Sequence, residues 1–244
     1  MKGNGDKVRL GVIGCGMVCD SYLETLQRFD HVAFAACADL LPERARQVAA
    51  QFGFGRACSV DELLRGDDTD LVLNLTIPAT HAELNLAALD RGKHVYSEKP
   101  LGITLQEAQA VLRRAGEKGL RVGCAPDTFL AGGHQHCRHL IDEGAIGRLV
   151  AAFGTVAGHG PDAYHANPHF FYEKGAGPML DQGVYIITAL LPLSDGSRPC
   201  RRGRRSASPT ARCSPSPASA RRSRCRRPPT WCAPWSSRRA AWPT

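Results

Sequence analysis

The sequence has no apolar run long enough to cross a membrane, and its first ten residues, MKGNGDKVRL, lack the apolar core of a secretory signal peptide. No C-x-x-C pair occurs among its ten cysteines, so neither a zinc ribbon nor a disulfide framework is indicated. These absences argue against a membrane protein and against a disulfide-stapled secreted domain. We therefore expect a cytoplasmic protein with reduced thiols, no membrane partner and no metal site.

The last 50 residues lack the side chains that build a protein core. Between Asp195 and Thr244 there is no Leu, Ile, Val, Phe, Tyr or Met, and 13 Arg stand against one acidic residue. The formal net charge of +8 comes from this tail, because residues 1–194 carry 18 basic and 22 acidic side chains. Such a composition cannot offset chain entropy by burying aliphatic surface.

Three interpretations of residues 194–244 compete. Arg-rich arms bind nucleic acid or anionic membranes, and a solvated linker needs no partner at all. The third interpretation is that Arg, Pro, Ala, Ser, Cys and Trp are what GC-rich codons yield when they are translated out of frame. The abrupt loss of aliphatic residues after ITALLPL favours this third interpretation, so we expect a truncated or frameshifted chain whose tail is disordered.

Strand and helix patterns alternate over residues 1–125, which is typical of a doubly wound parallel α/β sheet, the Rossmann architecture. Boundary residues agree, since Thr104 and Glu107 form a capping box, Pro42 stands at a helix start and Gly92 closes a helix. The predicted strands are residues 8–13, 32–38, 70–75, 93–96 and 121–124, and the predicted helices are residues 17–29, 42–52, 60–65, 80–91 and 104–118.

After residue 125 the pattern changes. We predict a helix over 134–143, a long strand through LVAAFGTVAG, an irregular segment and a helix from about Pro178. The chain is therefore expected to contain a Rossmann domain over 1–125 and the incomplete start of an α+β substrate domain over 126–193. The Arg/Pro/Ser-rich tail follows.

A glycine-spaced turn follows the first predicted strand, in RLGVIGCGMVC. A dinucleotide pyrophosphate requires Gly14 for a tight turn, Gly16 for close approach of the backbone, and a small third residue, here Cys19. Asp39 ends the second apolar run and can accept a hydrogen bond from an adenosine ribose. It would repel a 2′-phosphate, so we expect NAD, with NADP possible because Arg44 is near.

Polar groups follow the third and fourth predicted strands, in NLTIPATH and SEKP, and a further polar group, GPMLDQGVY, begins the last helix. Ligands bind beyond the carboxyl ends of parallel strands, so these are candidate site residues. The Glu-Lys-Pro step of residues 98–100, after the glycine turn, resembles the glucose-fructose oxidoreductase and inositol dehydrogenase family (Gfo/Idh/MocA). The resemblance covers residues 7 to about 191.

This resemblance implies an NAD(P)-dependent oxidoreductase that moves a hydride between the nicotinamide and a sugar or polyol hydroxyl. It places Glu98 and Lys99 toward the reacting carbon, and Pro78 and His81 on the nicotinamide side. The residues implied to bind the cofactor are Gly14, Gly16, Met17, Val18, Asp39, Thr76, Pro78, His81, Glu98 and Lys99.

Tyr185 departs from the family motif Asp-x-Gly-x-His, which begins at Asp181, because it stands where the catalytic His is usual. Oxidation of an alcohol leaves a hydroxyl proton that a positioned base must take. We expect Tyr185 to work with Lys99, since a nearby cation lowers the pKa of a tyrosine. The predicted catalytic residues are Lys99, Asp181, Tyr185 and His165.

Structural interpretations of the same residues remain open. Glu98 and Lys99 could form an exposed charge pair, Asp181 could cap a helix, and His81 could be an ordinary residue of a helix N-terminus. The aromatic run 164–172 fits a sugar-facing loop or a packed anchor equally well. The 134–143 helix carries three histidines, His134, His136 and His139. They fit a solvated helix face better than a metal site.

For the whole chain, two functions of other classes stay open. One is a nucleotide-binding regulator or inactive pseudoenzyme, which the Tyr185 departure favours. The other is nucleic-acid binding through the Arg-rich tail, which we do not expect. A homo-oligomer is expected only if the substrate domain is complete.

Overall fold

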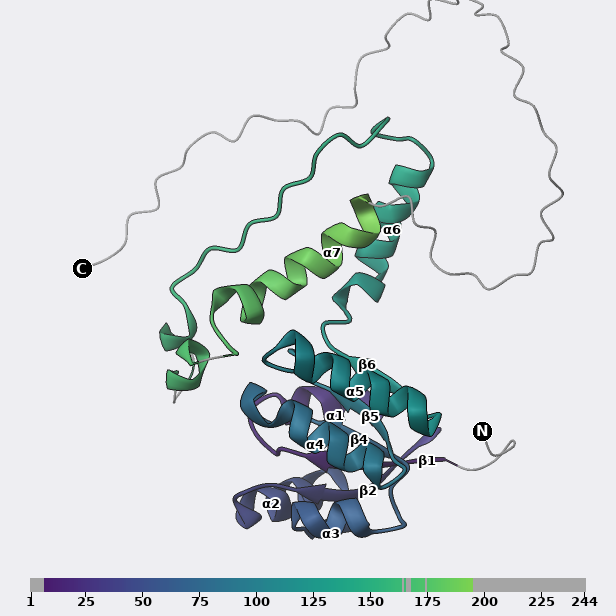
Figure 1. Cartoon of the computed structure of the whole chain (residues 1–244), viewed down its shortest axis with the longest axis vertical. Coiled ribbons are helices and arrows are strands. Elements are labelled where there is room, and N and C mark those ends of the chain that lie inside the picture. Colours follow the sequence, from purple (N-terminus) through teal and green to yellow (C-terminus); the bar gives the residue numbers. More distant parts are fainter. Residues whose placement is uncertain (1–6, 164, 166–167, 174, 195–244) are drawn as a thin grey trace, which may run out of the picture. The chain divides into compact units, whose positions relative to one another are not determined.

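The computed structural model describes residues 7–163, 165, 168–173 and 175–194 (Figure 1). Residues 195–244 lie outside the described part, so the expectations for the tail remain predictions. No helix in the described ranges is long and apolar enough to cross a bilayer.

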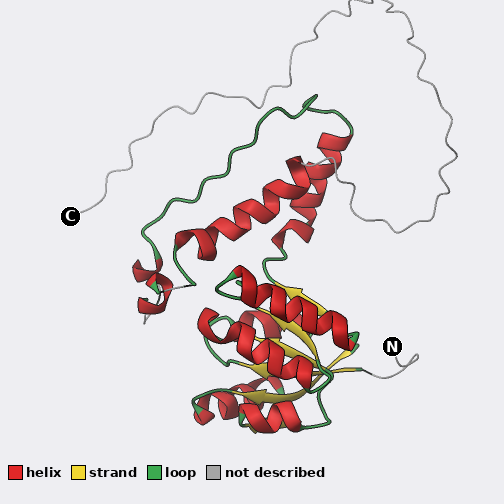
Figure 2. Ribbon diagram, in the orientation of Figure 1, coloured by secondary structure: helices red, strands yellow, loops and turns green. Residues whose placement is uncertain are grey.

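Six parallel strands form one sheet in the order β3-β2-β1-β4-β5-β6, which confirms the predicted doubly wound α/β fold (Figure 2). The chain order reverses between β1 and β4, and this switch point is where such sheets bind ligands. The strands are β1 Val8–Ile13, β2 Val32–Ala38, β3 Arg56–Cys58, β4 Leu71–Asn74, β5 His94–Ser97 and β6 Val122–Cys124.

Five helices connect the strands and cover both faces of the sheet (Figures 1 and 2). Pro42 and Pro78 open two of them, and Ser59 and Thr104 each make a complete capping box with the Glu three residues later. The helices are α1 Cys19–Leu26, α2 Pro42–Phe52, α3 Val60–Arg65, α4 Pro78–Asp90 and α5 Leu105–Lys118.

Alternate residues of β1 point to opposite faces of the sheet, and each face has its own apolar core. Val12 packs in the cluster that includes Leu23 of α1 and Val48 of α2. Ile13 packs in the other cluster, with Leu89 of α4 and Val111 of α5. Because β1 is packed on both faces, its position is fixed, and so is the position of the glycine turn that follows Ile13.

Beyond residue 125 the described chain is helical or irregular. The predicted helices are confirmed as α6 Gly132–Asp142 and α7 Val184–Ser194, the latter preceded by a π-helical turn, Met179–Gly183. Arg138 of α6 caps α7, since it donates to the backbone oxygens of Pro192 and Leu193 at 2.9 and 3.0 Å.

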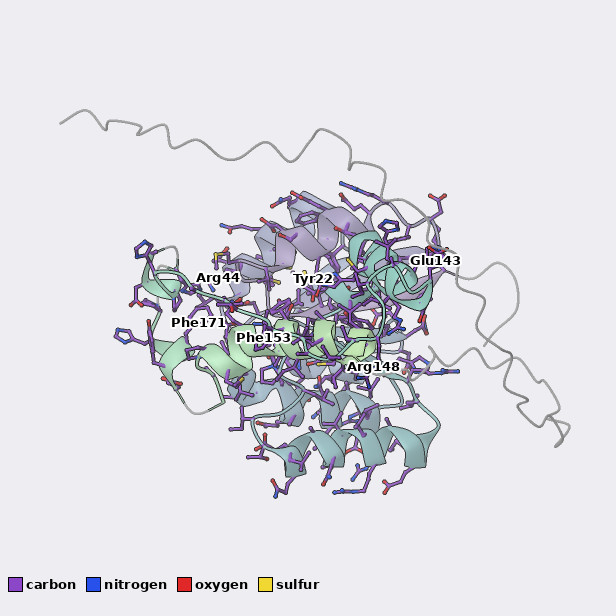
Figure 3. The ribbon with its side chains drawn as sticks, turned by 90° about the horizontal axis from the view of Figure 1, so that it is seen from above. Tyr22, Arg44, Glu143, Arg148, Phe153 and Phe171 are labelled. Atoms are coloured by element: carbon purple, nitrogen blue, oxygen red, sulfur yellow. The ribbon has the colours of Figure 1, made fainter. Side chains whose placement is uncertain are left out.

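One predicted strand does not form, and one observed strand was not predicted. The strand predicted through LVAAFGTVAG does not form, because no described strand pairs with it. Phe153 of this segment, labelled in Figure 3, has a side chain that is 93% exposed. The edge strand β3 was missed because three residues beginning with Arg56 are too short to show alternation.

Candidate functional site

The glycine turn lies against the end of β4. Gly14 has φ +98°, and a Cβ placed there would lie 2.7 Å from the backbone carbonyl of Leu75. Leu75 in turn donates its N–H to the Ile13 oxygen at 2.8 Å. Only glycine satisfies both the backbone conformation and this close approach.

Open space lies over the rest of the turn. A Cβ on Gly16 would meet no atom within 4 Å, and Met17 and Val18 are 62% and 42% exposed. Within the described part of the chain, the backbone N–H groups of Gly16, Met17 and Val18 donate no hydrogen bond. They lie at the N-terminal end of α1, where the helix dipole favours an anion.

Cys19 fills the third position of the fingerprint without a clash. It is the first residue of α1 and is fully buried in the same core cluster as Val12 and Leu23. A thiol is therefore small enough for the close contact between helix and strand that glycine or alanine provides elsewhere.

Asp39 follows β2 and is held by two backbone donors. Its carboxylate oxygens accept hydrogen bonds from the N–H groups of Cys15 and Leu41, each at 2.8 Å. Each oxygen keeps a further lone pair for a hydroxyl donor. A cavity of about 560 Å³ opens beside Asp39, between the start of α2 and the turn that joins β3 to α3.

A buried polar cluster supports the end of β4. The Asn74 side chain donates to Asn85 Oδ1 at 2.8 Å and accepts from the N–H and hydroxyl of Thr76. His81, 1% exposed, has its Nδ1 2.7 Å from the Pro100 oxygen and its Nε2 2.9 Å from the Thr76 oxygen. His81 therefore joins the segment after β4 to the segment after β5 through their backbone oxygens.

Glu98 follows β5 and faces inward. Its Oε1 accepts from the Tyr22 hydroxyl at 2.6 Å, and its Oε2 accepts from the Lys99 N–H at 2.9 Å. The exposed charge pair considered from the sequence is not formed, because Glu98 and Lys99 have different side-chain partners.

Lys99 is paired with Asp181. Its ammonium hydrogen-bonds the Asp181 carboxylate and donates to the Asp181 backbone oxygen at 3.0 Å. The two side chains are 15% and 16% exposed, so the pair is largely shielded from water. The Lys99 ammonium also lies 5.4 Å from the centre of the Tyr185 ring.

The expectation that Lys99 lowers the pKa of Tyr185 was wrong. Burial raises the pKa of the Tyr185 phenol, and the nearby carboxylates of Glu98, Asp181 and Asp127 raise this pKa further. The ammonium lies over the ring face and is already paired with Asp181, so the negative groups dominate. Tyr185 is therefore held as a neutral phenol.

His165, the other candidate base, packs against Phe171 edge to face, with ring centres 5.2 Å apart. Its backbone N–H donates to the Pro161 oxygen at 2.8 Å. Among the described residues no group of three His, Cys, Asp or Glu side chains is placed to hold a metal. The Nε2 atom of His139 lies 3.2 Å from the carboxylate of Glu143, the residue that follows α6.

Two side chains at this edge of the sheet were not predicted: Tyr22 and Asp127. Tyr22 looks like an ordinary apolar-face residue of α1, and nothing local in the sequence pairs it with Glu98. Asn74 opens the predicted segment NLTIPATH, and as a buried polar residue at the end of β4 it needs the partners that it has. Asp127 follows β6, and its charge helps to raise the pKa of Tyr96.

Family comparison agrees with this geometry. Residues 8–125 match the family model described as "oxidoreductase family, NAD-binding Rossmann fold", and residues 134–199 match the "GFO/IDH/MocA C-terminal domain". The chain belongs to the Gfo/Idh/MocA oxidoreductase family. The resemblance carried by the glycine turn and the Glu-Lys-Pro step is thereby confirmed.

Two curated relatives illustrate the match. The chain is 34% identical to the 1,5-anhydro-D-fructose reductase of Ensifer adhaerens, over 75% of this chain and 55% of that protein. It is 31% identical to inositol 2-dehydrogenase 3 of Saccharopolyspora erythraea, over 65% of this chain and 48% of that protein. The chain thus spans about half the length of these family members.

Solved structures share the fold. A putative myo-inositol dehydrogenase from Sinorhizobium meliloti superposes with a TM-score of 0.65 at 20% identity, covering 77% of this chain and 55% of the other. The scyllo-inositol dehydrogenase of Lactobacillus casei, solved with NAD(H) and scyllo-inositol, gives 0.55 at 20% identity, covering 58% and 43%.

Proposed function

We propose that this family member is an NAD-dependent oxidoreductase that interconverts a hydroxyl and a carbonyl on a sugar or polyol. The Lys99–Asp181 pair beside Tyr185 carries the proposal, because it places a shielded cation and a phenol together in one partly buried cluster. The relatives named as a sugar reductase and an inositol dehydrogenase support the substrate class.

The residues of the glycine turn fit a dinucleotide. A pyrophosphate fits the open space over Gly16, where the N–H groups of residues 16–18 make no hydrogen bond within the described part of the chain. The Asp39 carboxylate suits the adenosine ribose. The cavity beside Asp39 is of a size that holds a nucleoside. When bound, the nicotinamide supplies hydride transfer to or from the substrate carbon.

The side chains of the site stabilise the charge on the substrate oxygen and supply its proton. Lys99 stabilises a developing alkoxide electrostatically, and Asp181 holds its ammonium in place. Tyr185, kept neutral by its surroundings, donates a proton to that oxygen. A neutral donor suits carbonyl reduction, the direction in which the Ensifer adhaerens relative is named.

The test is NADH oxidation by the purified chain with 1,5-anhydro-D-fructose and with a keto-inositol, each against a blank without substrate. Lys99→Met keeps the length of the side chain but removes its charge, so it serves as the inactive comparison. Oxidation that depends on substrate and is lost in Lys99→Met supports the proposal. Equal rates in both proteins, or NADH binding with no oxidation of any carbonyl sugar, contradict it.

We also propose that the chain works in the cytoplasm, because six thiols of the described residues are free. Fractionation of cells that express the chain tests this location.

Assembly into a homo-oligomer is proposed only for a chain with a complete second domain. Size-exclusion chromatography with light scattering tests the assembly.

A further inference from the structure

One side-chain hydrogen bond joins the first helix to the segment that carries Lys99. The Tyr22 hydroxyl donates to Glu98 Oε1 at 2.6 Å, across 76 positions of sequence. Tyr22 lies one turn into α1, and α1 begins where the glycine turn ends. The bond therefore connects the candidate pyrophosphate site to the loop after β5.

Glu98 is fixed from several directions. Its second carboxylate oxygen accepts from the Lys99 N–H at 2.9 Å, and its own N–H donates to the Asn74 oxygen at 2.8 Å. The Cys124 thiol lies 3.7 Å from the Glu98 backbone oxygen. A displacement of the Glu98 carboxylate thus acts directly on the peptide group of Lys99.

Tyr22 is itself well held. The Tyr22 and Tyr96 rings meet edge to face, with centres 6.4 Å apart and planes at 64° (Figure 3 labels Tyr22). Burial and the Glu98 carboxylate both raise the pKa of Tyr22, so the phenol keeps the proton that it donates. A hydrogen bond to an ionised carboxylate is among the strong ones.

We propose that Tyr22 is a positioning residue that couples occupancy of the glycine turn to the placement of Lys99. By holding Glu98, it transmits the position of α1 to the Lys99 peptide and so to the ammonium paired with Asp181. The inference rests on the proposed cofactor site. Coupling of this kind is reciprocal, so a loosened Lys99 segment must also weaken binding at the turn.

The experiment compares Tyr22→Phe, which deletes only the hydroxyl, with Tyr96→Phe, which deletes the hydroxyl of the ring that packs against Tyr22. One readout is the acylation rate of each lysine by an N-hydroxysuccinimide ester without cofactor, followed by peptide mass spectrometry. The other is the NADH dissociation constant from calorimetry. Lys118, at the end of α5, is the internal reference in every protein.

We expect Tyr22→Phe to accelerate Lys99 acylation and to weaken NADH binding by about 5-fold or more, the lower end of typical coupling between sites. Lys118 should react equally in all proteins, and Tyr96→Phe should behave as wild type. In a Glu98→Leu background, adding Tyr22→Phe should change Lys99 acylation little further, because the Tyr22 hydroxyl then has no carboxylate to hold.

An unchanged Lys99 acylation rate in Tyr22→Phe overturns the inference, and so does a rise shared by all lysines, which would indicate general loosening. The acylation arm needs no cofactor, so it separates this failure from that of the proposed function. A wild-type chain that binds no NADH overturns the cofactor site and the coupling with it, whatever the acylation rates.

Discussion

Asp181 lies 82 positions after Lys99, yet its carboxylate and its backbone oxygen both hold the Lys99 ammonium. Both side chains are about 85% shielded from water, since their exposed fractions are 15% and 16%. Taking one partner from such a pair leaves a charge that water cannot solvate. The pair therefore contributes to stability as well as to the candidate site.

We predict that Asp181→Asn lowers the free energy of unfolding by about 3 kcal/mol, because it strands the buried Lys99 ammonium. Urea titration followed by circular dichroism measures the change. The control is Asp61→Asn, which breaks a pair with Arg65 whose side chains are 66% and 64% exposed and should cost at most about 0.5 kcal/mol. Equal losses in the two variants would contradict the prediction.

Gly14→Ala should destabilise the fold and prevent cofactor binding, since the new Cβ meets the Leu75 carbonyl at 2.7 Å and φ is +98°. Gly116→Ala is the matched control. Gly116 lies within α5 with no atom within 4 Å of a Cβ, so alanine should stabilise the helix by about 0.5–1 kcal/mol. The comparison uses thermal melting, and a Gly14→Ala melting temperature at or above wild type would refute it.

Stability should fall in alkaline solution, in part through Tyr96. Burial, followed by the charges of Asp127, Cys124 and Glu98, raises the pKa of Tyr96 to about 12. The unfolded chain loses this proton near pH 10, so the folded state loses its advantage as the pH rises from about 10 through about 12. Unfolding free energies measured from pH 8 to pH 12 should decline less steeply in Tyr96→Phe, and parallel curves would contradict this.

Asp39→Ala should weaken NADH binding and reduce the preference for NADH over NADPH. The carboxylate is placed to accept from a ribose hydroxyl and to repel a 2′-phosphate. Calorimetry with both cofactors on both proteins gives the four dissociation constants. Similar affinities of the wild type for NADH and NADPH would count against the role of Asp39, and Arg44 would then be the first residue to replace.

Much of the Rossmann domain was predictable because its signals are local. Alternation, capping boxes and proline starts placed α2 and α5 within a residue of their observed bounds. The contacts that define the site are long-range, so the sequence around Tyr22 does not predict its hydrogen bond to Glu98. The failed strand through Phe153 shows the same limit, since apolar residues form a strand only beside a partner strand.

The direction in which the fold shifts the pKa of Tyr185 could not be predicted for a related reason. The family resemblance places one cation, Lys99, in the site with Tyr185, but the sequence does not show that Asp181 already pairs with that cation. It also does not show that Glu98 and Asp127 lie near the same phenol. Only the folded arrangement determines which charges dominate.

Calorimetry of wild type against Gly16→Ala tests whether the glycine turn binds NADH. A Cβ on Gly16 meets no protein atom within 4 Å, so the variant should melt as wild type does. That same Cβ occupies the space proposed for the pyrophosphate, so NADH affinity should fall by about tenfold or more. A wild-type chain that binds no NADH, or a folded Gly16→Ala that binds it equally well, would show that the glycine turn is not the cofactor site.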